Sequence, residues 1–376
     1  MYLINHRYCC RGKNTEAKRK VRDMFSSIHV AKLGKSWKFE IGKEEVFVFL
    51  HPMRSPVALF VYNRLDNTRQ TLERLLVNTQ ARETDVYVFS DGGRDEASWK
   101  QVNELRSWLR KKKKEVEESG ALRSLTLTER PENIYLERNI MEGVAQVLSE
   151  HETIIVLEDD ICTSRYYLEY MNEAFDLYRD IPKVMHVSGF TNLDLPVDAA
   201  HPEQNFYFTP HMSGWGWGTW RDRWNQYYHH FQSREEALQG MTESDQKEME
   251  YGGVFPCLKG LDKNPIPWDI CWEIAIYKAG GLCLTPAHTM IRNIGLKNGT
   301  HFRSMDILQW YEYDREPLDE PLRLVRVDNP QSNPQTEALF REAIRDWGIR
   351  YTMLGKVVRM LYKNILQPLM EKRGKK

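Results

Sequence analysis

The chain has 376 residues, of which 41% are hydrophobic and 28% are charged, so it is long enough for one large α/β domain with additions or for two domains. Its formal net charge is zero, which gives no global argument for a nucleic-acid partner. The six cysteines form no CxxC pair and no zinc-type spacing with histidine, and they are too few for a disulfide scaffold, so we expect a reducing compartment.

The two ends of the chain bear on its location. The first twenty residues lack the apolar core of a signal peptide, and no apolar run approaches the roughly 18 residues that a membrane span needs. We therefore expect a cytoplasmic protein. Residues 344–376 set apolar side chains among Arg and Lys, and this basic amphipathic pattern predicts peripheral contact with the anionic inner surface of a membrane. The alternative is a helix packed on the domain with a frayed basic tail.

The first 54 residues are mixed and basic, with a hairpin predicted at 39–50. From Pro56 onward, short apolar runs predict strands buried on both faces, and the stretches between them predict helices. Strands are predicted at 57–62, 86–90, 122–127, 153–157 and 184–188, and helices from residue 66 or 67 to 78 and at 96–118, 139–149 and 166–178. This alternation indicates an α/β fold, a mostly parallel sheet with helices on both faces.

Polar residues follow three of the predicted strands, where such sheets bind their ligands. Arg64 follows the first strand and suits a phosphate or a base, although a pair with a surface acid would explain it equally well. Asp91 follows the second strand. It could accept hydrogen bonds from a uracil-type base or a ribose hydroxyl, or simply open the turn at 91–93.

The carboxylate triplet Glu158, Asp159 and Asp160 follows the fourth and most apolar strand. Three such groups at a strand end are costly, because like charges repel and burial adds desolvation. A divalent cation, Mn²⁺ or Mg²⁺, offsets that cost, since these ions take oxygen ligands and keep substrate phosphates in their shell. The alternative is a solvated turn. With Arg64 and Asp91 at other strand ends, we favour the metal site.

Three downstream segments add candidate residues. The glycine–tryptophan run at 213–220 allows close backbone approach and offers a flat stacking face, although it could be a loop packed against the sheet. Asp269 lies near the start of a predicted helix with Glu273 one turn on. Either could act as a general base, while Asp269 could instead cap the helix. His301 ends a glycine turn and could complete a metal shell, although a lone histidine is more often structural.

Taken together, the segments between about Pro56 and Phe302 resemble the GT-A glycosyltransferases, most of all the group that contains the animal Golgi N-acetylglucosaminyltransferase I and many family 2-like bacterial relatives. The family pattern departs at Ile270, where the animal enzymes carry a second acid, and in the absence of a recognisable membrane anchor. The resemblance implies nucleotide contact by Arg64, uracil binding by Asp91, donor binding by Glu158, Asp159, Trp217 and Trp268, a metal ion at Asp160 with His301, and a catalytic base at Asp269 with Glu273 in reserve.

The fold expected from this resemblance is GT-A, with a nucleotide half at 55–160 and an acceptor half at 161–305. Residues 1–54 and 306–376 would be extensions. The expected reaction is metal-dependent, inverting transfer from a nucleoside diphosphate sugar, here a UDP-sugar, to a hydroxyl of a glycan or lipid-linked glycan in cell-surface glycan synthesis. A sugar nucleotidyltransferase would show a glycine-rich loop after the first strand, and residues 62–66 have no glycine. A non-catalytic sugar-nucleotide-binding relative would lack the triplet or Asp269.

Overall fold

The computed structural model describes the backbone of strands between residues 29 and 49, and it describes residues 54–295, except 194, 199 and 254, and 315–350, with side chains from 54 to 342. The chain divides into two units, Met1–Met53 and Arg54–Lys376. In the first unit, β1 (His29–Leu33), β2 (Ser36–Ile41) and β3 (Glu44–Phe49) form an antiparallel sheet. The pairing of β2 with β3 confirms the predicted hairpin.

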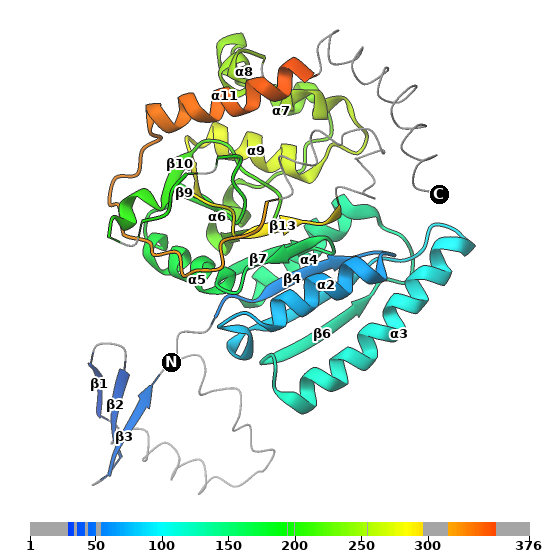
Figure 1. Cartoon of the computed structure of the whole chain (residues 1–376), viewed down its shortest axis with the longest axis vertical. Coiled ribbons are helices and arrows are strands. Elements are labelled where there is room, and N and C mark those ends of the chain that lie inside the picture. The colour runs from blue at the N-terminus through cyan, green and yellow to red at the C-terminus, as the bar shows by residue number, and fades with distance from the viewer. Residues whose placement is uncertain are drawn as a thin grey trace, which may run out of the picture. The chain divides into compact units, whose positions relative to one another are not determined.

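The second unit is built on an eight-stranded sheet in the order β10-β12-β9-β11-β7-β4-β5-β6 (Figure 1). Six of its strands run parallel, while β10 and β11 run antiparallel to their neighbours. The strands are β4 (Val57–Val61), β5 (Asp85–Ser90), β6 (Ser124–Glu129), β7 (Thr153–Glu158), β9 (Val184–Ser188), β10 (Phe206–Thr209), β11 (Trp217–Trp220) and β12 (Leu282–Pro286). A small antiparallel pair joins β8 (Ile161–Thr163) to β13 (Ile291–Asn293). The predicted α/β class with a largely parallel sheet is confirmed.

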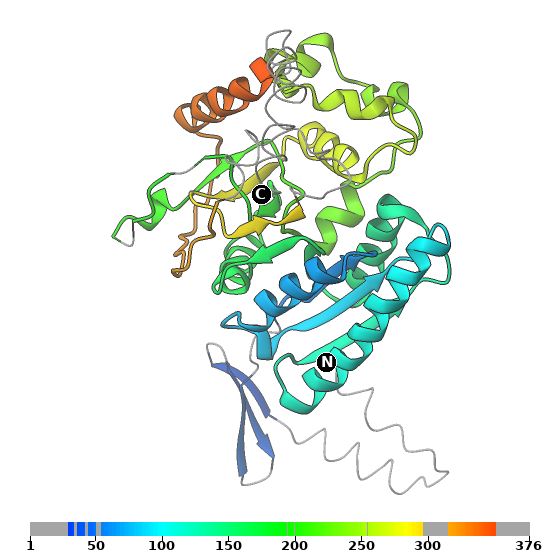
Figure 2. The same cartoon turned by 45° about the vertical axis from the view of Figure 1, so that its right-hand side comes forward.

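Helices cover both faces of this sheet because its strands are apolar on both sides. Val57, Leu59 and Val61 point to the face covered by α2, α3 and α5, while Ala58 and Phe60 point to the face covered by α4, α6 and α9. Figure 2 shows α3 running beside the edge strand β6. The helices are α2 (Leu65–Leu76), α3 (Glu96–Ser119), α4 (Tyr135–Glu150), α5 (Tyr167–Tyr178), α6 (Arg221–Tyr227), α7 (Arg234–Leu238), α8 (Glu243–Met249), α9 (Trp268–Lys278) and α11 (Pro334–Arg350), with short 3-10 turns at Ala81–Glu83, Pro202–Gln204, Tyr251–Gly253 and Cys257–Asp262.

Two local predictions are wrong in detail. The first helix begins at Leu65 rather than after an Asp66 or Asn67 cap, so Arg64 itself occupies the N-cap position. The glycine–tryptophan run is not only a loop, since Trp217–Trp220 forms β11 in the middle of the sheet. Gly218 is required there, because a Cβ at this position would overlap the backbone of β7 and the ring of Phe175.

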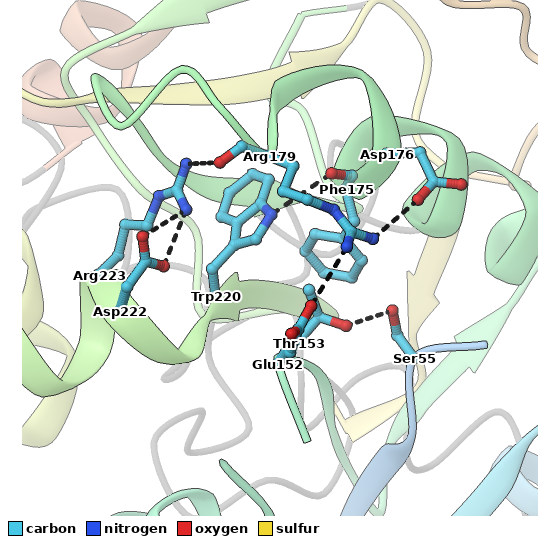
Figure 3. Close-up of polar contacts among 9 residues, drawn as sticks. All are labelled: Ser55, Glu152, Thr153, Phe175, Asp176, Arg179, Trp220, Asp222 and Arg223. Carbon is cyan, nitrogen blue, oxygen red and sulfur yellow. Dashed lines mark hydrogen bonds and ion pairs between the residues drawn. The ribbon is translucent and has the colours of Figure 1, made fainter. Parts of the chain in front are cut away.

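The amino-terminal end of β7 is fixed by a network of polar contacts (Figure 3). Trp220 donates from Nε1 to a carbonyl of α5 at 3.4 Å, and the Arg223 guanidinium stacks 4.5 Å from its ring. Arg223 also donates to the carbonyl of Arg179 at 2.7 Å, which satisfies a free carbonyl at the end of α5. The hydroxyls of Ser55 and Thr153 are 2.7 Å apart. These contacts connect the amino-terminal end of β7 and its partner β11 to α5 and to the segment before β4.

Residues 315–333 and α11 pack onto the same unit. Tyr178 donates to the carbonyl of Val325 at 2.8 Å, and Tyr251 donates to Glu337 of α11 at 2.6 Å. Phe340 is buried against Tyr251. Over the part of the chain that the structure describes, no helix combines the length and apolar character of a membrane span. Most of the predicted basic amphipathic segment, residues 351–376, lies outside the described residues.

Candidate active site

The order of strands reverses next to β4. The chain passes from β4 to β5 and then β6 on one side, and it later returns to place β7 on the other side. Ligands of open α/β sheets bind beyond the carboxyl ends of the strands at such a reversal. Arg64 follows β4, and the triplet begins at the last residue of β7, so both lie at the predicted place.

Arg64 joins the second and third carboxylates of the triplet. Its Nη2 forms ion pairs with Asp159 Oδ1 and, at 2.8 Å, with Asp160 Oδ2, and its Nε donates to Asp159 at 3.2 Å. Asp159 is only 3% exposed, and Thr71 of α2 donates to its carbonyl at 2.9 Å. Burial raises the pKa of Asp159 to about 6, although Arg64 acts in the opposite direction. The Arg64 guanidinium therefore favours the ionised form of Asp159, against the effect of burial.

Glu158 points the other way from Asp159, because successive side chains of a strand alternate between faces. It pairs with Phe60 of β4 and shares the face that α4 and α9 cover. Burial, and then the carboxylates of Asp160 and Asp159, raise the pKa of Glu158 well above its usual range, and Asp269 of α9 adds to the effect. The triplet thus places Glu158 on the face of the sheet that α9 covers and Asp159 on the opposite face.

Asp160 is enclosed by the segment that follows β13. The amide of Ile294 donates to the Asp160 carbonyl at 2.8 Å, and the Asn293 side chain accepts from the amide of Gly295 at 2.8 Å. A Cβ at Gly295 would overlap the Asp160 carboxylate, so a larger residue at this position would require that carboxylate to move.

A divalent cation fits this arrangement through one protein carboxylate. Within the described ranges, no group of three or more His, Cys, Asp or Glu side chains is placed to hold a metal ion. Mg²⁺ and Mn²⁺ are often held by one or two carboxylates, with the remaining positions filled by water and substrate phosphates. The partly exposed Asp160 carboxylate matches that donor set. The predicted second ligand, His301, lies outside the described residues.

Asp91 is buried behind the end of β5 and organises the loop around it. Its Oδ1 accepts from the amides of Gly92 and Ile134, each at 2.9 Å, and its Oδ2 accepts from the Asn133 side chain at 2.9 Å. Burial raises the pKa of Asp91, while the two amides work against that shift. These donors show the turn role of Asp91, and its role toward a base stays a prediction.

A partly exposed aromatic cluster beside Asp91 was not predicted. The Arg94 guanidinium lies 5.5 Å from the ring of Tyr62 and 4.9 Å from the ring of Tyr135, and its Nε donates to Asn133 at 3.3 Å. Tyr135 is 55% exposed and has a φ of 65°, which is unusual for a bulky residue. Tyr62 at the end of the first predicted strand was the one sequence signal, whereas the place of Tyr135 at the start of α4 and its strained backbone have none.

The two predicted donor-stacking tryptophans are core residues in this structure. Trp217 is fully buried, and its ring stacks on Trp268 at 5.0 Å and on His186 at 5.4 Å. Trp268 is also buried, and Gly214 lies against its ring. Neither indole presents an open face to a sugar, because both indoles are buried among neighbouring rings. The run of tryptophans therefore forms the packing between β11 and α9.

The two candidate bases differ in their surroundings. Asp269 lies in the first turn of α9, where Pro267 and not Asp269 is the N-cap, and it accepts from the amide of Ile270 at 2.8 Å. Burial raises the pKa of Asp269, and the charge of Glu273 adds to this shift. Glu273 is 4% exposed with both carboxylate oxygens engaged, by His211 at 2.5 Å and by the Met212 amide at 2.9 Å. Glu273 is therefore the more fully engaged of the two candidate carboxylates.

Comparisons with known proteins give structural likeness only. No protein-family model and no curated protein sequence matches the chain. It is structurally similar to GT-A glycosyltransferases and to a UDP-glucose pyrophosphorylase. The mannosyltransferase PcManGT from Pyrobaculum calidifontis, in complex with GDP-Man and Mn²⁺, has 14% identity and a TM-score of 0.33 over 60% of this chain and 73% of its own.

Two further structures are similarly distant. For S. aureus TarS 1-349, the identity is 11% and the TM-score 0.35, over 65% of this chain and 61% of the TarS chain. For the UDP-glucose pyrophosphorylase complexed with UDP-glucose, the values are 10% and 0.32, over 62% of this chain and 91% of the other. The chain thus spans less than two thirds of the TarS chain. The roles discussed below rest on the geometry of this chain.

Proposed function

We propose that this protein is a metal-dependent glycosyltransferase that moves a sugar from a nucleoside diphosphate sugar to an acceptor hydroxyl with inversion. One observation supports this above the others. At the reversal of strand order, Arg64 pairs with Asp160 just beyond the end of β7, while Glu158 lies on the face of the sheet that is covered by α9, the helix of Asp269. A cation-and-carboxylate site for a diphosphate thus adjoins a separate carboxylate that can accept a proton.

The donor would lie along the carboxyl ends of β4, β5 and β7. Arg64 would keep its contact with Asp159 and turn from Asp160 to the diphosphate, since a guanidinium binds phosphate oxygens in a bidentate manner. The base would stack on the cluster of Tyr62 and Tyr135, with the Asp91 carboxylate accepting from its ring nitrogen. A pyrimidine with a ring N–H, as in UDP-sugars, meets that requirement.

Asp160 would hold the metal, with water and diphosphate oxygens as the other ligands. When bound, the cation supplies positive charge against the leaving diphosphate. Asp159 would remain the partner of Arg64, and Glu158 would contact the donor sugar, as expected from the sequence. A glycan or lipid-linked glycan is the acceptor that we expect.

Asp269 would act as the general base. In a single displacement, the acceptor oxygen forms a bond to the anomeric carbon while the bond from that carbon to the diphosphate oxygen breaks. The acceptor proton passes to the Asp269 carboxylate, and the nucleoside diphosphate leaves. The first turn of α9 favours an ionised carboxylate through the helix dipole, whereas burial raises its pKa and makes it a better proton acceptor.

A donor panel read by thermal unfolding tests this proposal. UDP-, GDP- and dTDP-sugars are added with and without Mn²⁺, and one UDP-sugar is expected to raise the melting temperature by about 5 °C or more when present at a hundred times its Kd. The shift should disappear with EDTA. If no nucleotide sugar stabilises the protein with Mn²⁺, the transferase proposal is contradicted. Pyrophosphate-dependent formation of UTP from a UDP-sugar would instead identify a nucleotidyltransferase.

A further inference from the structure

A buried carboxylate–imidazole pair lies behind the proposed base. Glu273 and His211 are 62 residues apart in the chain, and neither is more than a few percent exposed. His211 Nδ1 and Glu273 Oε1 are 2.5 Å apart, and because an ionised carboxylate only accepts hydrogen bonds, we assign the imidazole proton to Nδ1. The Met212 amide donates to Oε2. Both oxygens of Glu273 are therefore bound to the segment after β10.

These contacts join the elements that carry the two site carboxylates. Glu273 lies one helical turn after Asp269 on α9. The segment bound to Glu273 leads into β11, which pairs with β7 from Trp217 opposite Val156. Glu158 lies two residues after Val156 on β7. The position of Asp269 relative to Glu158 is therefore set through the contact of Glu273 with residues 211 and 212.

The imidazole of His211 is fixed by aromatic rings. Its centroid lies 4.4 Å from that of Tyr251, 5.9 Å from that of Phe255 and 6.0 Å from that of Phe340. The three rings come from different segments, including α11. A side chain enclosed in this way keeps one orientation, so the hydrogen bond to Glu273 is held in place.

The charge of Glu273 also reaches Asp269. The groups that face Asp269 are the Glu273 carboxylate and Cys271 thiol of α9, the Lys263 ammonium before that helix, the Glu158 carboxylate of β7 and the Tyr228 hydroxyl after α6. Among these, Glu273 disfavours ionisation of Asp269 and Lys263 favours it. A neutral group at position 273 would therefore make Asp269 easier to ionise.

We propose that Glu273 and His211 form a clamp that positions Asp269 for proton transfer and supplies negative charge beside it. The inference rests on the proposed function and changes the role of Glu273, which becomes a positioning residue. Its carboxylate touches neither donor nor acceptor. The pair acts on the reaction only through Asp269.

Two substitutions test the clamp through different readouts. Glu273→Gln keeps the size of the side chain and removes its charge, so the acidic limb of the kcat–pH profile should move to lower pH. His211→Phe removes the donor to Glu273 Oε1, and the resulting shift of α9 should lower kcat by about 10- to 100-fold with a smaller change in the donor KM. His211→Gln keeps an N–H donor and should recover most of that loss.

A direct titration separates this inference from the proposed function. The ¹³C carboxyl signal of Asp269, assigned by its loss in Asp269→Asn, is followed against pH without any donor. Its midpoint should fall in Glu273→Gln and stay unchanged in the control Glu248→Gln, whose exposed side chain contacts Tyr277 at the far end of α9. An equal midpoint in wild type and Glu273→Gln would overturn the clamp. If wild type uses no nucleotide sugar but the midpoint falls, only the proposed function fails.

Discussion

Replacing Asp269 with asparagine is expected to lower the rate of sugar transfer by about 10²–10⁴-fold, the usual contribution of a general base. Asparagine keeps the shape of the side chain and an oxygen for the Ile270 amide, so the first turn of α9 should persist. What is lost is the group that takes the acceptor proton. The measurement is kcat for nucleoside diphosphate release with a saturating donor and Mn²⁺, while donor binding should change little.

The control for this substitution is Asp262→Asn. Asp262 is an exposed acid shortly before α9 and pairs with Arg234 at the surface, so its loss should leave kcat within a factor of two or so. Full activity in Asp269→Asn, combined with loss of activity in Glu273→Ala at unchanged stability, would show that the base is Glu273. We expect the base to be Asp269, because Glu273 is buried and both of its carboxylate oxygens accept hydrogen bonds.

Asp160→Asn is expected to remove most of the metal dependence of the reaction. The charged oxygen ligand is lost, and with it the charge that holds the cation against the leaving diphosphate, so the rate should fall by about 10²–10³-fold or more. Binding of Mn²⁺ in the presence of donor should weaken in parallel. Both effects are measured by titrating Mn²⁺ against the rate and against the melting temperature.

Gly295→Ala provides a second route to the same loss. An added Cβ would overlap the Asp160 carboxylate and displace it, although every charged group of the site is kept. Asp66→Asn serves as the matched control, because it removes an exposed carboxylate two residues from Arg64. Wild-type Mn²⁺ dependence in both Asp160→Asn and Gly295→Ala would exclude Asp160 as the metal ligand.

The parts of the fold that could be predicted are those with a local pattern. The strands β4, β5, β7 and β9 could be predicted from their apolar runs, because both faces of these strands are buried. β11 was missed because its four residues include a glycine and resemble a loop. It is a strand because Trp217 and Trp220 find partners in β7 and the helices around it. These contacts join segments that are distant in the sequence, so the local sequence carries no signal for them.

The same division applies to the site. Strand-end position indicated Arg64 and Asp160, and the fold brings them together because β4 and β7 are neighbours. The pairing of His211 with Glu273 joins distant parts of the chain, and the fit of Gly295 against Asp160 depends on where β13 lies. The expected donor contact of Trp217 and Trp268 also could not be checked from the sequence, and in the fold these two buried indoles stack on each other.

The most direct test of the central claim is electron density from crystals soaked with Mn²⁺ and a UDP-sugar. We expect the diphosphate between Arg64 and a metal ion on Asp160, the base beside Asp91, and the anomeric carbon facing Asp269. A nucleotide bound elsewhere, or a diphosphate at this strand end without a metal ion on Asp160, would contradict the account.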